Sequence, residues 1–271
     1  MRKIKKAEMT TQQIVGLTIL IISFGVLLFF LTRLNLQELT DKEICHNSVI
    51  LNEKNPNPFQ SGSLDCRTSY ICISGGGDCK DFSHTSKREI SLVSDGKINK
   101  ERIMKQIAEE MSDCWWMFGE GKLEYVKLGL NSRICAMCSV IAFDEKIQNN
   151  EELSDITYKE FYDFLGDTDR KDSEKYLKYL YNSYNKNEVL GEDYLNKKII
   201  LSEQYFILTG MGESWTKFLL KYGFRISFII SQTSEAGEEL LDEIHSLPIT
   251  ILEKTQENFE ILSCDKFITK A

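Results

Sequence analysis

The longest apolar run in the chain lies near its N-terminus. Residues 14–31 read IVGLTILIISFGVLLFFL, which is eighteen positions without a charged side chain. At about 1.5 Å per residue, a helix over 14–32 covers close to the ~30 Å hydrocarbon core of a bilayer. A single segment crosses lipid only as a helix, because lipid offers its peptide groups no hydrogen-bond partner. The pattern therefore predicts a transmembrane helix over 14–32.

The charges that flank this run differ between its two sides. Four Lys or Arg residues lie within the first six positions, whereas only Arg33 follows the run before Glu38 and Asp41. Because cytoplasmic loops carry the excess of basic residues, this asymmetry places 1–13 in the cytoplasm and the rest of the chain outside. No small-residue cleavage site of a secretory signal follows the run. We therefore expect a single-pass signal-anchor protein of the cell membrane, bound to lipid through this helix.

Periodic apolar positions beyond the run predict one helix clearly. Over 99–118 the apolar residues recur at spacings of three and four, Asn99 is a suitable N-cap, and Gly119 and Gly121 follow as terminators. Further helices are expected within 150–196, over 213–222 and over 234–245.

Runs rich in β-branched and aromatic residues predict the strands. The run 68–73 and the run 88–94 flank the glycine-rich 74–78, which predicts a β-hairpin. Other strands are expected over 48–51, 133–143, 199–209, 224–231, 248–254 and 258–263. The pattern predicts a juxtamembrane segment over 33–62 and an extracytoplasmic α+β domain over 63–271, with antiparallel strands, packed helices and a possible sub-boundary near 150–197.

All cysteines follow the apolar run, and their number is even. In a compartment that permits oxidation this predicts disulfides rather than free thiols. On a strand, Cys135 and Cys138 would face opposite sides and so form two separate bridges. We expect Cys114 to pair with one of these two, and Cys79 to pair with Cys66 or Cys72. The disulfide candidates are Cys45, Cys66, Cys72, Cys79, Cys114, Cys135, Cys138 and Cys264.

Three stretches suggest chemistry, and each lacks a required part. The pair Cys135 and Cys138 forms a CxxC motif, but a β-forming run follows it, whereas a redox-active CxxC opens a helix that lowers the thiol pKa. The glycine run at 74–78 lacks the G-K-[ST] ending of a phosphate loop. The stretch around Ser214 resembles a nucleophile elbow, yet Thr216 replaces its second glycine. We predict no catalytic, cofactor or metal site, and leave an enzyme open only as an envelope thiol-disulfide oxidoreductase.

Charge restricts the partners of the predicted outer domain. Beyond residue 40 the chain has 28 basic and 39 acidic residues, which gives a net charge of −11. Such a surface repels nucleic acid. We expect other envelope or surface proteins as partners, and no nucleic acid.

Two parts of the chain resemble known families. The stretch Lys6-Ala7-Glu8-Met9, followed by TTQQ and the apolar run, resembles the class III (prepilin-type) signal of archaeal type IV pilins. This implies cleavage between Ala7 and Glu8 and packing of the apolar helix in a filament core. The stretches DCWWMFGEG and CAMCSVIAF resemble those of uncharacterised membrane-anchored, Cys-rich archaeal surface proteins, which implies a surface location and no known activity.

The resulting hypothesis is a membrane-anchored cell-surface protein with a structural, adhesion or interaction role. Its alternatives are a pilin-like subunit processed after Ala7 and an oxidoreductase that uses Cys135 and Cys138.

Overall fold

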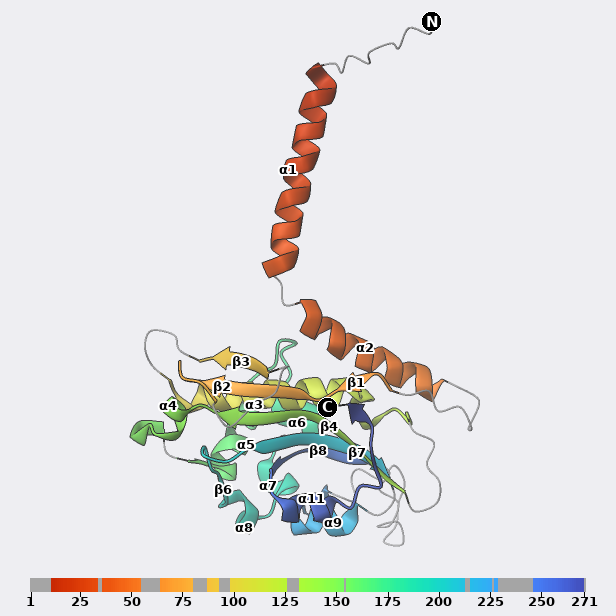
Figure 1. Ribbon diagram of the computed structural model, residues 1–271. Coiled ribbons are helices and arrows are strands. Elements are labelled where there is room, and N and C mark those ends of the chain that lie inside the picture. The colour runs from red at the N-terminus through yellow and green to blue at the C-terminus, as the bar shows by residue number, and fades with distance from the viewer. Residues whose placement is uncertain are drawn as a thin grey trace, which may run out of the picture. The chain divides into compact units, whose positions relative to one another are not determined.

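The computed structural model describes residues 11–33, 36–54, 64–79, 87–92, 98–125, 132–153, 155–212, 215–225, 227–228 and 246–270 (Figure 1). The chain divides into two compact units, Met1–Asp41 and Lys42–Ala271. Helix α1 (Thr11–Arg33) belongs to the first unit. Helix α2 (Leu36–Glu53) begins in the first unit and contributes its residues from Lys42 onward to the second.

The first unit corrects the prediction made from the apolar run. Within the part of the chain that the structure describes, no helix combines the length and apolar character needed to cross a membrane. This finding overturns the prediction of a transmembrane helix over 14–32.

The second unit contains a mixed sheet. Its strands follow the order β3-β2-β4-β7-β8, and β9 also pairs with β4. The β4–β7 and β7–β8 pairs are antiparallel, whereas the β2–β3, β2–β4 and β4–β9 pairs are parallel. The strands are β2 (Ser69–Ser74), β3 (Lys87–Ser91), β4 (Arg133–Phe143), β7 (Tyr205–Gly212), β8 (Ser246–Glu253) and β9 (Lys266–Phe267).

The pairing directions correct two predictions. Because β2 and β3 are parallel, the glycine-rich turn after β2 does not make the predicted hairpin. The α+β class holds, but the strands are not all antiparallel. Side-chain periodicity predicts that a segment is a strand and which side chains share a face, and it carries no information on the direction of the neighbouring strand.

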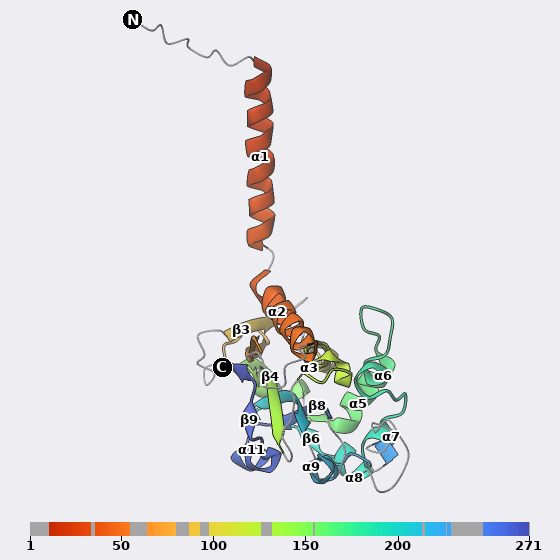
Figure 2. The same ribbon diagram turned by 90° about the vertical axis from the view of Figure 1, so that its right-hand side faces the viewer.

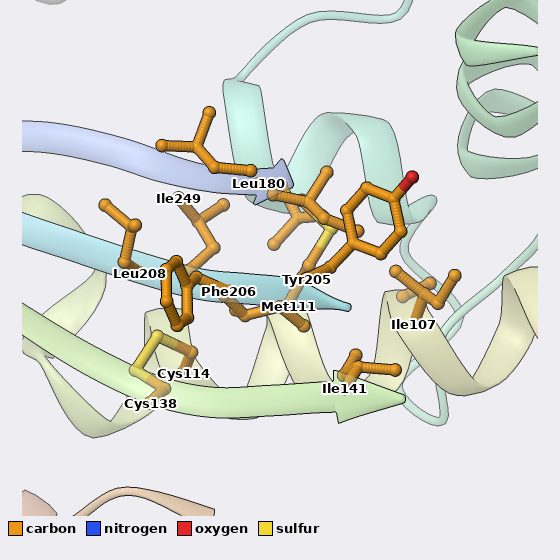
Figure 3. Close-up of a cluster of buried hydrophobic side chains, with 14 of the residues drawn as sticks. Ile107, Met111, Cys114, Cys138, Ile141, Leu180, Tyr205, Phe206, Leu208 and Ile249 are labelled. Carbon is orange, nitrogen blue, oxygen red and sulfur yellow. A yellow bond between two sulfur atoms is a disulfide. The ribbon is translucent and has the colours of Figure 1, made fainter. Parts of the chain in front are cut away.

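Helix α3 (Lys100–Met117) forms as predicted. The Asn99 side chain accepts a hydrogen bond from the Arg102 backbone N–H at 3.0 Å, and so caps the helix. The predicted apolar stripe is buried, and in Figure 3 Ile107 and Met111 lie close to Ile141 of β4. Figure 2 shows α3 and α11 (Gln256–Leu262) on opposite sides of β4, so the sheet is covered on both faces.

The remaining elements are short. They comprise η1 (Gly119–Gly121), α4 (Glu145–Gln148), η2 (Glu151–Leu153), α5 (Tyr158–Asp167), α6 (Tyr176–Tyr181), α7 (Lys186–Val189), α8 (Glu192–Leu195) and α9 (Thr216–Lys221), with the two-residue strands β1 (Cys66–Arg67), β5 (Ile156–Thr157), β6 (Lys198–Ile199) and β10 (Thr269–Lys270).

Three predicted strands are wrong where the structure describes them. The stretch 48–51 continues α2, and 258–262 lies in α11, which starts where the Thr255 side chain accepts from the Asn258 backbone N–H. Within 224–231, Phe224 makes a single bridge to Leu190 and 227–228 are helical. The predicted helix over 234–245 lies outside the described residues.

Tyrosine hydroxyls from two helices reach the outer edge of β8. Tyr181 of α6 donates to the Ile249 carbonyl at 3.0 Å, and Tyr162 of α5 donates to the Tyr181 hydroxyl at 2.9 Å. Both tyrosines are buried, and burial raises the pKa of each phenol above its ordinary value. The hydroxyls therefore remain protonated, so each can donate, and the Tyr181 hydroxyl satisfies an edge carbonyl that has no strand beside it among the described residues.

Candidate functional site

The structure confirms the prediction of disulfides. Each of the eight cysteines is bonded, and none is free. Cys114 and Cys79 each bond to one of the two partners expected for them. The four disulfides are Cys45–Cys66, Cys72–Cys79, Cys114–Cys138 and Cys135–Cys264.

The CxxC pair forms two separate bridges. Cys138 bonds to Cys114 of α3 on one face of the sheet (Figure 3), whereas Cys135 bonds to Cys264, which follows α11. The exposed fractions of Cys135 and Cys138 are 0% and 1%. Thiol-disulfide exchange needs an accessible sulfur, and in a CxxC enzyme the two cysteines pair with each other. The geometry therefore does not favour the oxidoreductase alternative.

The glycine-rich turn after β2 binds a carboxylate of the chain itself. The fully buried Asp144 accepts through Oδ2 from the backbone N–H groups of Gly75 at 2.9 Å and Gly77 at 2.5 Å, and from the Ser74 hydroxyl at 3.0 Å. Its Oδ1 accepts from the Ile147 backbone N–H at 2.9 Å and caps α4. The N–H groups that a phosphate loop would direct at a ligand are thus directed at Asp144.

The glycines of this turn are explained by the close approach of Asp144 to the backbone, and a disulfide holds the two ends of the turn together. A Cβ on residue 77 would lie 2.7 Å from Asp144 Oδ2, so a larger residue would displace the carboxylate. The Cys72–Cys79 disulfide closes the turn. The glycine run is therefore a structural feature that joins β2 to α4.

Substitution of Asp144 by Asn tests this interpretation. An amide nitrogen in place of one carboxylate oxygen would face N–H donors and leave them unsatisfied. We expect Asp144→Asn to lower the free energy of unfolding by about 1–3 kcal/mol. Urea unfolding of the variant beside the parent chain measures the loss. A variant as stable as the parent would show that the carboxylate does not hold the turn.

A second buried carboxylate joins four elements. Glu110 of α3 has a side-chain exposure of 3% and pairs with Arg88 of β3. Lys42 of α2 lies 3.7 Å from the same carboxylate and 2.6 Å from Asp113, and the Ser139 hydroxyl of β4 donates to Glu110 at 3.3 Å. Burial raises the pKa of Glu110, and the attraction of Lys42 and Arg88 offsets only part of that effect. The sequence gives no signal for this cluster, because its members come from separate segments.

The candidate ligand site is a cavity beside η1 and α6. Its volume is about 480 Å³, and Leu180, Trp115 and Tyr181 line it with exposed fractions of 7% or less. Polar side chains line the rest, from η1 and the following residue, from the turn at 172–174, and from α6 and its C-cap: Glu120, Lys122, Asp172, Glu174, Lys178, Tyr179 and Asn182. The turn belongs to the charged segment 167–175.

Unusual backbone conformations gather around this cavity. Among the described residues other than glycine, four have positive φ, and three of them lie here: Glu120 (φ 58°), Ser173 (φ 67°) and Asn182 (φ 52°). Asn182 caps α6, a position that favours this conformation. For Glu120 and Ser173 the left-handed conformation costs about 1–2 kcal/mol each. Strained residues of this kind concentrate at functional sites, provided that the surroundings hold them in place.

Most charges at the cavity have partners. Tyr179 donates to Glu120 Oε1 at 2.9 Å, and Lys122 donates to Glu120 Oε2 at 2.6 Å. Burial alone would raise the pKa of Glu120, but these hydrogen bonds outweigh it, and the pKa lies below its usual value. Arg170 lies 3.3 Å from Asp172 and covers the ring of Tyr179. The carboxylate of Glu174 has no hydrogen bond or ion pair to another described residue.

The remaining predicted site residues are placed as follows. Ala7 and Glu8 lie outside the described residues. No group of three or more potential metal ligands occurs in the described ranges. Trp115 is buried, while Trp116 is half-buried and stacks on His46 of α2 with 4.0 Å between ring centroids.

Comparison with known proteins returns no relative. No protein-family model, no curated protein and no solved structure matches this chain.

Proposed function

We propose that the chain is an extracytoplasmic structural protein that assembles with other copies of itself through α1. The disulfides support the location, because four bonds that use all eight cysteines persist in an oxidising compartment. The role rests on one observation, the exposure of the apolar side chains of α1. The second unit then carries the surface that such an assembly presents.

The apolar surface of α1 surrounds the helix. Consecutive residues are about 100° apart, so the run Ile19–Ile22 alone points in four directions. A helix that is apolar on all sides needs neighbours on all sides, which a bundle of several helices provides and one docked partner does not. Exposed fractions of 45–64% are found for Val15, Leu17, Ile19, Leu20, Ile21, Ile22, Phe24, Val26, Leu27, Leu28 and Phe29.

Site-specific crosslinking of the full chain tests the assembly. A photoreactive benzoylphenylalanine in place of Phe24, which is 59% exposed on α1, should crosslink copies of the chain to one another. The same group in place of Leu51, which is 70% exposed on α2, is the matched control and should give no such product. Denaturing gels after illumination measure the crosslinks.

Two results would contradict the proposal. One is a Phe24 crosslink only to lipid or to an unrelated protein. The other is equal self-crosslinking from Phe24 and Leu51, which would indicate unspecific aggregation.

A pilin-like subunit is the more specific form of this proposal. It is supported by the course of α1, which starts at Thr11, shortly after Ala7-Glu8, and has no charged residue before Arg33. Mass spectrometry of the mature N-terminus tests whether the chain is cleaved between Ala7 and Glu8. A chain that begins at Glu8 supports processing, and an intact Met1 or Arg2 excludes it.

A further inference from the structure

We propose that the cavity between η1, the turn at 172–174 and α6 binds a neutral, hydroxyl-rich ligand, and that this ligand is a saccharide. The cavity volume of about 480 Å³ lies within the ~300–1,000 Å³ of small-molecule sites. The inference concerns the second unit alone and does not depend on assembly through α1.

Charge balance favours a neutral ligand. Glu120 is neutralised by Lys122, and Asp172 is neutralised by Arg170. Of the charged side chains that line the cavity, this leaves Glu174 and Lys178, which have opposite signs. A strongly anionic or cationic ligand would disturb these pairs without a surplus of opposite charge to hold it.

The hydrogen-bonding groups of the cavity favour a ligand that donates hydrogen bonds. Glu174 has a carboxylate without a described partner, and a carboxylate accepts up to about four hydrogen bonds. Asp172 keeps acceptor capacity beside its pair with Arg170, and its side chain is 56% exposed. Lys178 already donates to the Asn182 side chain, and Lys122 already donates to Glu120. Free acceptors thus outnumber free donors, and sugar hydroxyls supply the missing donors.

The apolar lining fits the other face of a sugar. Trp115 and Tyr181 lie at the buried side of the cavity with exposed fractions of 7% and 2%, while the acceptors lie on exposed segments. A pyranose has hydroxyls around its rim and C–H groups on its faces, so it can use both kinds of surface at once. Glu120 and Ser173, which lie at the two polar walls, both have left-handed backbone conformations.

Binding of neutral trisaccharides to the full chain tests the proposal. Maltotriose, cellotriose and triacetylchitotriose are titrated at millimolar concentration, with saturation-transfer difference NMR and tryptophan fluorescence as readouts. At least one should bind saturably. Glu174→Ala should weaken that binding about tenfold or more, as expected for loss of a hydrogen bond to a charged group. Glu192→Ala removes an exposed glutamate on α8, outside the cavity, and should leave binding unchanged.

Several outcomes would overturn the proposal. It fails if none of the three trisaccharides binds. It also fails if one binds but neither Glu174→Ala nor Asp172→Ala weakens it, since the binding site is then elsewhere. Spermidine, a polyamine, serves as a competitor. If it displaces the sugar and binds more tightly in a manner that depends on Glu174, the ligand is a cation and the assignment to a saccharide is wrong.

Discussion

Removal of the Cys135–Cys264 disulfide is expected to lower the free energy of unfolding by about 5 kcal/mol. The two cysteines are 129 residues apart, and their bond joins the centre of the sheet to the C-terminal segment. In the chain-entropy account, a disulfide stabilises by restricting the unfolded chain, and the effect grows with the logarithm of the loop length. The change is the double variant Cys135→Ala with Cys264→Ala.

The matched control removes the shortest loop. Cys72 and Cys79 are only 7 residues apart, so Cys72→Ala with Cys79→Ala should cost about 2 kcal/mol. Guanidinium unfolding of both double variants beside the parent chain gives the comparison. Equal losses would show that native packing around the sulfurs, and not loop length, determines the contribution of each bond.

Replacement of Arg88 by Met is expected to cost about 3–5 kcal/mol, because it leaves Glu110 buried without its nearest cation. Lys42 at 3.7 Å compensates only in part. The neighbouring Lys87 is the control: it pairs with Asp78, whose side chain is 66% exposed, so Lys87→Met should cost no more than about 1 kcal/mol. Urea unfolding measures both variants. A similar loss for both would mean that the burial of Glu110 has little energetic effect.

The same carboxyl gives stability a dependence on pH. Because the pKa of Glu110 is raised in the folded chain, the folded state holds its proton at a pH where the unfolded state has released it. The contribution of Glu110 to stability therefore falls as pH rises from about 4.5, the ordinary carboxyl value, through the raised pKa. Arg88→Met should steepen this fall, since it removes an attraction that lowers the pKa. Glu110→Gln should abolish it, and a slope that persists in Glu110→Gln would assign the effect to another group.

Local patterns in the sequence predict the parts of this fold that depend on local physics. Helix α3 has an N-cap, an apolar stripe and two terminating glycines, and each of these acts within a few residues. Strand β4 has a β-forming run, and its alternation correctly separates Cys135 from Cys138. The directions of strand pairing depend on the path of the chain between strands, and the hairpin expected after β2 failed for that reason.

The candidate site is harder to predict because its walls come from distant segments. Glu120 and Tyr179 are 59 positions apart and meet only when α6 packs beside the end of α3. The charged segment 167–175 is visible in the sequence, but its composition alone is typical of a solvated loop. Nothing in the residue types shows that Glu120 and Ser173 take positive φ, since most residues with that conformation are glycines.

The tyrosine hydroxyls at β8 limit the ways in which copies of this chain can join. An edge strand whose backbone groups are free can take up a strand from another molecule and extend its sheet. At β8 the Ile249 carbonyl is already bonded to Tyr181, which in turn accepts from Tyr162. A visiting strand would have to displace a buried pair of phenols before it could form its own ladder. Growth of the sheet across this edge is therefore disfavoured, which leaves the edge at β3 and contacts between helices as the routes by which copies can associate without unfolding one another.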